Sequence, residues 1–536
     1  MKKNRMLAVC AAAAGITFGI SSAVAETPKR GGVLNYIVPA DAPGFDGHRE
    51  STFAMLQPIR PYYSVLIRVD PDNPASTTDF VCDVCVGKVP ESTDDGTTYT
   101  FKIRDDVKFH TGETMTADDV AASFNKIIFP PEGVRSHRRG VYSMVESVNA
   151  PDKSTVVFKL KFASNVFIPA LAIPFNWIYQ KSVLDKDIHW YETNINGSGP
   201  FIFKERQAGA FMRGERNPNY YHKGKPYLDG IKAIVGNKQS LRVQAIRGDR
   251  AAIEFRGFPP ASRDDLVKAL GKDVTVQENA WNCPVNFAPN HKRKPFDDAR
   301  VRRALSLAVD RWNGSKYLSK IAIVKTVGGI TYPGHALSPT VEELKQIAGF
   351  WPDIKKSRAE ARRLLKESGV DLSKTYKFLV RGVDQPYKIV ATWLIDQWRQ
   401  VGIKFKQETH PTGPFYAIQR GTKDFDVSTD ASCNSVINPL LDVSKYLSAD
   451  RVSNNYYEYI DRDVDTLYDK MLRSVDVKEQ RKLMLEITKL TLDTHANQFP
   501  ILWWNRIIPH RAYVKGWKIG PSHYLNQALD NVWLDK

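Results

Sequence analysis

Cysteines and histidines are the first side chains of this sequence whose types could support chemistry. Cys82 and Cys85 form a Cys-x-x-Cys pair, which is half of a zinc site. A second close Cys or His pair is not evident, and the 11 histidines show no metal-ligand spacing. A thioredoxin-type redox role would place the first cysteine at a helix start, whereas Gly87 and Pro90 follow this pair. A local disulfide or two structural thiols fits better than a metal or redox site.

Three pairs of adjacent aspartates could be considered as acid–base groups: Asp94/Asp95, Asp105/Asp106 and Asp118/Asp119. Each pair is contiguous in sequence and lies in a predicted turn or helix start, which does not favour catalysis. The sequence contains no His-Glu-x-x-His, Gly-x-Ser-x-Gly or Gly-x-Gly-x-x-Gly motif. We therefore expect no catalytic residue, no metal and no cofactor. An exported hydrolase or sugar-binding enzyme stays open as the alternative, because 11% of the residues are aromatic.

The first 25 residues predict a secretory signal peptide. Lys2, Lys3 and Arg5 precede an apolar run, and Ala23-Val24-Ala25 is a small-x-small cleavage site. We expect cleavage after Ala25 and a soluble, exported protein, since no later stretch approaches transmembrane length. Removal of the segment lowers the net charge from +17 to about +14. The basic residues are scattered, and for an exported protein nucleic acid is the least expected anionic partner.

The chain of 536 residues is too long for one core, so two or more domains are expected. Trp281 to Asp310, near the midpoint, predicts a strand, a turn at Pro295 and an amphipathic helix after Asp297 and Asp298. Further along, predicted strands and helices alternate, which indicates a three-layer α/β unit. This part of the chain has strands at 376–381, 403–407, 424–429 and 498–504, and helices at 358–368 and 389–398.

A second informative block runs from Asp94 to Phe124. Tyr99, Phe101 and Ile103 alternate with polar residues as in a half-buried strand, and Thr116 begins a predicted helix. Its string Asp-Gly-x-x-Tyr-Thr-Phe, Phe-His-x-Gly and Thr-Ala-x-Asp-Val resembles the periplasmic solute-binding proteins of the peptide/nickel (family 5) class. Further resemblance lies in Gly-Gly-x-Leu at 31–34, Gly-x-Gly-Pro at 197–200, Gly-Lys-Pro at 224–226 and Lys-Pro-Phe-Asp-Asp at 294–298. The similarity spans Gly31 to about Trp504.

The resemblance implies a two-lobed α/β fold of the periplasmic-binding-protein type, class II-like, with an extra subdomain in the first lobe. The first lobe would comprise 26–70 and 196–282, with the extra subdomain at 71–195 between them. The second lobe would span 283–498, and 499–536 would return to the first lobe. The implied function is the binding component of an ABC importer, a monomer that closes by hinge motion on a small-molecule solute and delivers it to membrane permease subunits.

The resemblance also implies where the solute lies, namely in the cleft between the lobes. Trp281 matches an aromatic pocket position, and Arg381 and Arg420 fall near cleft-lining positions. The segment after Phe425-Asp426-Val427 contributes directly in related oligopeptide binders. In this chain the corresponding residues are Ser432, Cys433, Asn434 and Ser435. A bridge at the same spacings in those proteins implies a disulfide between Cys283 and Cys433.

The ligand itself is not fixed by the resemblance, because the class binds peptides, nickel complexes, oligosaccharides and opines. In the related oligopeptide binders, an aspartate two residues after the second bridge cysteine pairs with the ammonium terminus of the peptide. Ser435 stands at that position here, and Asp430, five residues earlier on a predicted strand, is not expected to replace it. A buried ammonium without a carboxylate is costly. We therefore predict a peptide-like or other small polar solute, including anionic ones, and poor binding of peptides with free amino termini.

Overall fold

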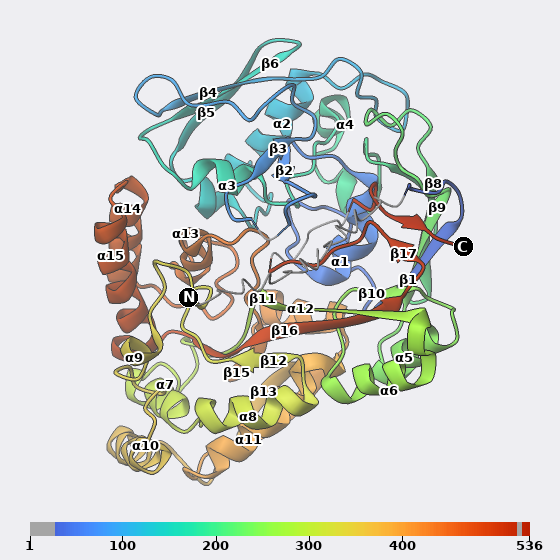
Figure 1. Cartoon of the computed structure of the whole chain (residues 1–536). Coiled ribbons are helices and arrows are strands. Elements are labelled where there is room, and N and C mark those ends of the chain that lie inside the picture. Colours follow the sequence, from blue (N-terminus) through green and yellow to red (C-terminus); the bar gives the residue numbers. More distant parts are fainter. Residues whose placement is uncertain (1–26, 75, 522–527) are drawn as a thin grey trace, which may run out of the picture.

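The computed structural model describes residues 27–74, 76–521 and 528–536. The predicted signal peptide at residues 1–25 lies outside these ranges. Helices and sheets are mixed throughout the described chain, in agreement with the predicted two-lobed α/β class (Figure 1). None of the described helices is both long and apolar enough to cross a membrane.

Two long antiparallel strands cross the middle of the molecule (Figure 1). β11 (Val274–Pro289) and β16 (Phe499–Arg511) stay paired along their length, with two register shifts. The second half of β11 is fully buried, whereas the residues of its first half are half-buried or exposed. The strands predicted around Trp281 and at 498–504 are therefore confirmed, and their pairing ties the middle of the chain to its last part.

One end of this pair contacts a five-stranded sheet. Its order is β10 (Ile253–Glu254), β1 (Val33–Val38), β9 (Gly230–Val235), β8 (Phe211–Arg216) and β7 (Phe201–Gln207). The backbone N–H of Phe258, just after β10, donates to Ile507 O over 2.8 Å, and that of Arg511 donates to Ala252 O over 2.9 Å. Helices α5 (Gln239–Arg247) and α6 (Pro260–Leu270) flank this junction.

The other end belongs to a six-stranded sheet. Its order is β12 (Val324–Thr326), β16, β11, β15 (Val427–Ala431), β13 (Thr375–Arg381) and β14 (Lys404–His410). β13 pairs parallel with both of its neighbours, and α11 (Ile389–Arg399) connects it to β14. The predicted helix after the midpoint is α7 (Ala299–Leu307), where the Asp298 side chain accepts from Arg300 N over 2.8 Å. The predicted α/β order of this half is confirmed.

A third, three-stranded antiparallel sheet lies at the top of Figure 1. It contains β4 (Thr98–Lys102), β6 (Thr155–Leu160) and β5 (Val145–Asp152), and α2 (Ala117–Ile128) packs on it. The chain leaves this region through Gly197 and Gly199. An added Cβ would lie 2.0 Å from Tyr62 O at Gly197 and 2.5 Å from Tyr62 C at Gly199, so close backbone approach requires glycine at both positions. The residue boundaries of the lobes and the extra subdomain stay a prediction.

The remaining strands and α-helices of the described residues lie around these sheets. The strands are β2 (Ile67–Val69), β3 (Phe80–Cys82), β17 (Val514–Lys515) and β18 (Trp533–Leu534). The helices are α1 (Phe53–Ile59), α3 (Phe167–Leu171), α4 (Lys181–Lys186), α8 (Arg311–Ile321), α9 (Val341–Leu344), α10 (Ile354–Ser368), α12 (Thr412–Ala417), α13 (Pro439–Val443), α14 (Arg462–Arg473) and α15 (Val477–Lys489).

Candidate functional site

A buried polar cavity of about 50 Å³ lies where the start of α1 meets the ends of β13 and β15. One water molecule needs roughly 10–15 Å³ measured in this way, so the cavity has room for about four. Its walls come from segments that are far apart in the sequence, which is typical of a binding site. The lining residues are Ser51, Thr52, Phe53, Asn286, Arg381, Tyr387, Tyr416, Arg420, Asp430, Ala431, Ser432, Cys433, Lys445, Asn454, Tyr456, Tyr457 and Gln498.

Arg381, the last residue of β13, reaches across the cavity. Its guanidinium donates to the Thr412 and Tyr416 hydroxyls over 3.1 and 3.0 Å, and to the Thr52 hydroxyl over 3.4 Å. Thr52 is the N-cap of α1 and falls in the segment predicted for the first lobe, whereas Arg381 falls in the segment predicted for the second. The side chain is 1% exposed, so its charge is held by hydrogen bonds and neighbouring rings instead of bulk water.

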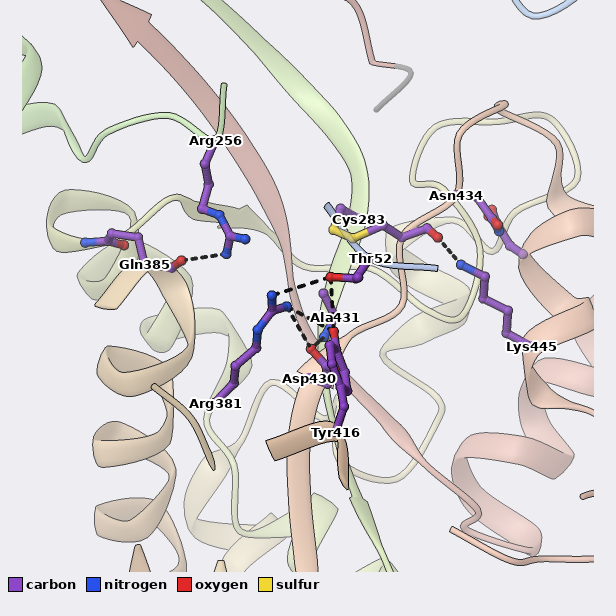
Figure 2. The surroundings of a disulfide bond; sticks show 12 residues. Thr52, Arg256, Cys283, Arg381, Gln385, Tyr416, Asp430, Ala431, Asn434 and Lys445 are labelled. Atoms are coloured by element: carbon purple, nitrogen blue, oxygen red, sulfur yellow. Dashed lines mark hydrogen bonds and ion pairs between the residues drawn. A yellow bond between two sulfur atoms is a disulfide. The ribbon is translucent and has the colours of Figure 1, made fainter. Parts of the chain in front are cut away.

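Sheet register places Asp430 beside Arg381. β13 and β15 run parallel with Val380 opposite Thr429, so the next residues on the two strands are neighbours as well. Asp430 Oδ1 lies 4.0 Å from Arg381 Nη1, and Figure 2 shows the two groups meeting below Thr52. Burial raises the pKa of Asp430 above its usual value, and Arg381 opposes that rise. The carboxylate therefore depends on a cation for its charge.

Arg420 forms an ion pair with Glu50, which lies 370 residues earlier in the chain, in the segment predicted for the first lobe. Its Nη1 lies 2.7 Å from Oε2 of Glu50, and its guanidinium carbon lies 3.8 Å from the Tyr416 ring centroid and 5.4 Å from that of Tyr456. Burial disfavours its charge, but Tyr456 and Glu50 more than compensate and raise its pKa. A cation and an anion that are distant in the sequence thus meet in a nearly dry environment, where removal of one partner is costly.

Lys445 adds a third cation to the wall. Its ammonium donates to the backbone carbonyl of Cys433, as Figure 2 shows, and burial lowers its pKa while Asp442 opposes that change. Cys433 is joined by a disulfide to Cys283 of β11, as predicted. This bridge fixes the segment after β15 against the central strands. The second bridge joins Cys82 to Cys85, which resolves the alternative left open by the sequence.

The predicted site residues divide into two groups in the structure. Arg381, Arg420, Ser432 and Cys433 line the cavity, whereas Trp281, Asn434 and Ser435 are absent from the described lining. Trp281 is buried between Phe53 and Trp504, with both ring centroids 5.1 Å away. Asn434 donates to Asp442 over 2.6 Å, and Ser435 is buried nearby. Contact of these seven residues with solute stays a prediction.

Sequence reasoning did not select several cavity residues. Thr52, Tyr416, Lys445, Tyr456 and Tyr457 lie on helices or loops with no motif around them. Asp430 is not expected from the sequence to replace the missing aspartate, because it lies five residues earlier and on a strand, yet it lines the cavity. The available signal was a charged residue in an otherwise buried strand, since a buried aspartate needs a partner.

Comparison with known proteins identifies the family of this chain. The profile of the bacterial extracellular solute-binding proteins, family 5, matches residues 85–454. The chain belongs to this family. Family 5 proteins are solute-binding transport proteins, and this one captures a small solute between its two lobes and delivers it to the permease of an ABC importer. That membership favours binding over the hydrolase alternative, because family 5 consists of transport proteins and not enzymes.

Relatives of this family 5 protein have different named ligands. Di/tripeptide-binding protein 1 of Pseudomonas aeruginosa is 26% identical over 468 residues, which cover 80% of this chain and 82% of that protein. Heme-binding protein A of Haemophilus influenzae is 23% identical, with 81% of each covered.

Solved structures share the fold. AppA of Bacillus subtilis in complex with a nonapeptide superposes with a TM-score of 0.82 at 21% identity, covering 95% of this chain and 100% of that one. AgaA of A. tumefaciens R10 in complex with agropinic acid gives 0.79 at 21% identity, covering 94% and 99%.

Proposed function

We propose that the solute captured by this family 5 protein is a small, polar, carboxylate-bearing molecule, peptide-like or otherwise. The main support for this proposal is the charge of the cavity wall. Arg381, Arg420 and Lys445 bring three cations to it, and Asp430 alone among the described lining residues carries a carboxylate. An anionic group on the solute is favoured there, because a low-dielectric site strengthens its attraction to these cations.

Unused polar atoms support a hydrogen-bonding solute. Among the described residues, Arg420 Nε, Asn286 Oδ1 and Asn454 Oδ1 are buried without a hydrogen-bond partner, and all three side chains line the cavity. Buried polar groups are usually paired, and ligand atoms can supply the missing partners. These atoms offer one donor and two acceptors, which suits the carbonyl and N–H groups of an amide-containing molecule.

A free ammonium terminus is disfavoured in our proposal. Asp430 is the carboxylate within reach, but Arg381 lies 4.0 Å from it and Ala431 N donates to it over 2.9 Å. An ammonium would compete with Arg381 for this group and would face the charges of Arg420 and Lys445. We therefore retain the prediction that peptides with free amino termini bind poorly.

Closure of the lobes accompanies binding in this proposal. The cavity is far smaller than the 300–1,000 Å³ typical of ligand pockets, so a peptide-sized solute requires the walls to separate. Contacts from Arg420 to Glu50 and from Arg381 to Thr52 would break on opening and form again on closure. We further propose that the protein acts as a periplasmic monomer after cleavage at Ala25, with the lobe boundaries given above.

Two measurements test the ligand class. Native mass spectrometry of the purified protein identifies any retained solute. Calorimetry with di- to pentapeptides, each free, N-acetylated or C-amidated, then compares the two termini. We expect N-acetylation to preserve or improve affinity and C-amidation to weaken it at least about tenfold. Micromolar binding that disappears on N-acetylation but survives C-amidation would refute the proposed preference for carboxylates.

A further inference from the structure

Arg256 is a buried arginine beside the cavity that no sequence motif indicated. It follows β10 at the junction with β16 and is 0% exposed. Its Nη1 donates to Gln385 O over 3.1 Å, whereas Nε and Nη2 have no hydrogen-bond partner among the described residues. An arginine side chain carries five N–H donors, so much of its hydrogen-bonding capacity is unused.

An acidic residue lies close to Arg256 in the sequence, but it is already paired with another arginine. Glu254, two residues earlier, is paired with Arg242 at 3.2 Å and accepts from Gly257 N. Aromatic rings surround the guanidinium instead, with the centroids of Phe53, Tyr387 and Trp504 5.6, 5.6 and 5.5 Å from its central carbon. The polar end of Tyr387 also interacts with Arg256, but the Nε and Nη2 donors stay without a partner among the described residues. Rings stabilise a cation, but they do not satisfy its N–H groups.

Arg256 faces a second buried arginine. Figure 2 shows the guanidinium groups of Arg256 and Arg381 pointing toward one another. Both lie against Tyr387, since the central carbon of Arg381 is 5.4 Å from its ring centroid. Burial lowers the pKa of Arg256, and the positive charge of Arg381 lowers it further although Tyr387 opposes this. Two like charges are thus held together at the edge of the cavity that Phe53 and Tyr387 line.

We propose that Arg256 and Arg381 together form a subsite for a carboxylate group of the solute. A carboxylate has two oxygens that match the paired N–H groups of guanidinium, so one anion can satisfy donors of both arginines and relieve their repulsion. Arg256 comes from the side of the five-stranded sheet and Arg381 from β13 of the six-stranded sheet. The bound carboxylate would therefore also hold the two sides together. This inference rests on the proposed function and names the residues that recognise the charged end.

The test uses acetate and acetamide, which have the same shape and differ in charge. Wild-type protein is melted in 100 mM sodium acetate, and in 100 mM acetamide with sodium chloride at equal ionic strength. Binding to the folded form raises Tm, so we expect a higher Tm in acetate than in acetamide. Titration of ¹³C-carboxyl acetate by NMR gives the dissociation constant. Arg256→Gln should weaken acetate binding at least about tenfold and abolish the Tm difference.

Arg311→Gln is the matched control. Arg311 is also 0% exposed, but its N–H groups donate to the backbone carbonyls of Ser306, Gly349 and Pro500. Its loss should lower Tm in both solutions equally and leave the difference between acetate and acetamide intact. If a glutamine variant does not fold, Arg256→Lys and Arg311→Lys replace the pair, since lysine keeps the charge but loses the planar fork.

Two results would overturn the subsite. One is the absence of any acetate-specific binding to wild type, and the other is an Arg256 variant that binds acetate as tightly as wild type does. The proposed function is judged separately by the peptide panel. Carboxylate-dependent peptide binding that survives Arg256→Gln would leave the function standing and remove only the subsite.

Discussion

Glu50→Gln tests whether charge pairing across the cleft controls closure. The substitution removes the carboxylate that lies 2.7 Å from Arg420, in a pair whose side chains are only 8% (Arg420) and 11% (Glu50) exposed. Glu50 is absent from the described cavity lining, so the change should not remove a solute contact. In a closed protein the arginine would stay buried without its anion, whereas in an open one water could solvate it.

The expected magnitude follows from this difference. Breaking a buried ion pair costs about 3–5 kcal/mol, and the glutamine oxygen can still accept one hydrogen bond, so we expect about 2–3 kcal/mol against the closed form. Because solute binds to that form, affinity should fall about 30- to 150-fold. Small-angle scattering should show less compaction at a given solute concentration. The melting temperature without solute should change little.

Asp424→Asn is the control for removal of a carboxylate from an arginine partner. Arg293 lies 2.8 Å from Asp424, but this pair is 34% and 55% exposed and does not cross the cleft. Such a surface pair contributes less than about 1 kcal/mol. Unchanged affinity and compaction in Glu50→Gln would refute the role in closure. A large loss of melting temperature without solute would assign the pair to folding instead.

Three further predictions concern stability and binding. Replacing Cys283 and Cys433 by serine opens a loop with a sequence separation of 150 and should cost up to about 5 kcal/mol, and denaturant unfolding that shows no loss would contradict this. Burial lowers the pKa of His48 to about 3, of His110 to about 4 and of His291 to about 3. Below pH ~6.5 the unfolded chain therefore binds more protons at these histidines than the folded protein does, so the free energy of unfolding should fall as the pH drops from there toward 4. Equal free energies of unfolding at pH 7 and pH 5 would contradict the prediction that these three histidines are buried in their neutral form. Arg381→Gln should weaken binding of the preferred solute about tenfold or more by calorimetry, and an unchanged dissociation constant would exclude Arg381 from recognition.

The fold could be predicted from the sequence because its local signals agree with one another. Alternating aromatic residues mark β4, and an apolar stripe of period near 3.6 marks α11. Asp298 at the start of α7 has the side chain that a helix N-cap requires, and the structure uses it in that way. Each of these features depends on a few neighbouring residues, which is why one sequence is enough to find them.

The cavity could be predicted only in part, since its residues meet through pairing between distant strands. Arg381 and Asp430 are neighbours because β13 and β15 pair parallel in one register, and a shift by one residue would turn each side chain to the opposite face. No local pattern encodes that register. Thr52 reaches the same point from the start of α1, more than 300 residues earlier, and Arg256 arrives through the junction of β10 with β16.

Once a fold is known, a buried charge without a partner of opposite charge identifies such residues. Most buried ions in the described chain have a partner of opposite charge, as Lys126 has in Asp46 at 2.5 Å, or a set of carbonyls, as Arg311 has. Arg256 instead contacts one backbone carbonyl, the Tyr387 side chain and two further aromatic rings, and its Nε and Nη2 atoms have no hydrogen-bond partner among the described residues. Burying a charge without a partner is costly. A buried, unpaired arginine beside a cavity is therefore explained if a bound ligand supplies the opposite charge. A carboxylate on the solute is the partner that the geometry of two facing guanidinium groups fits.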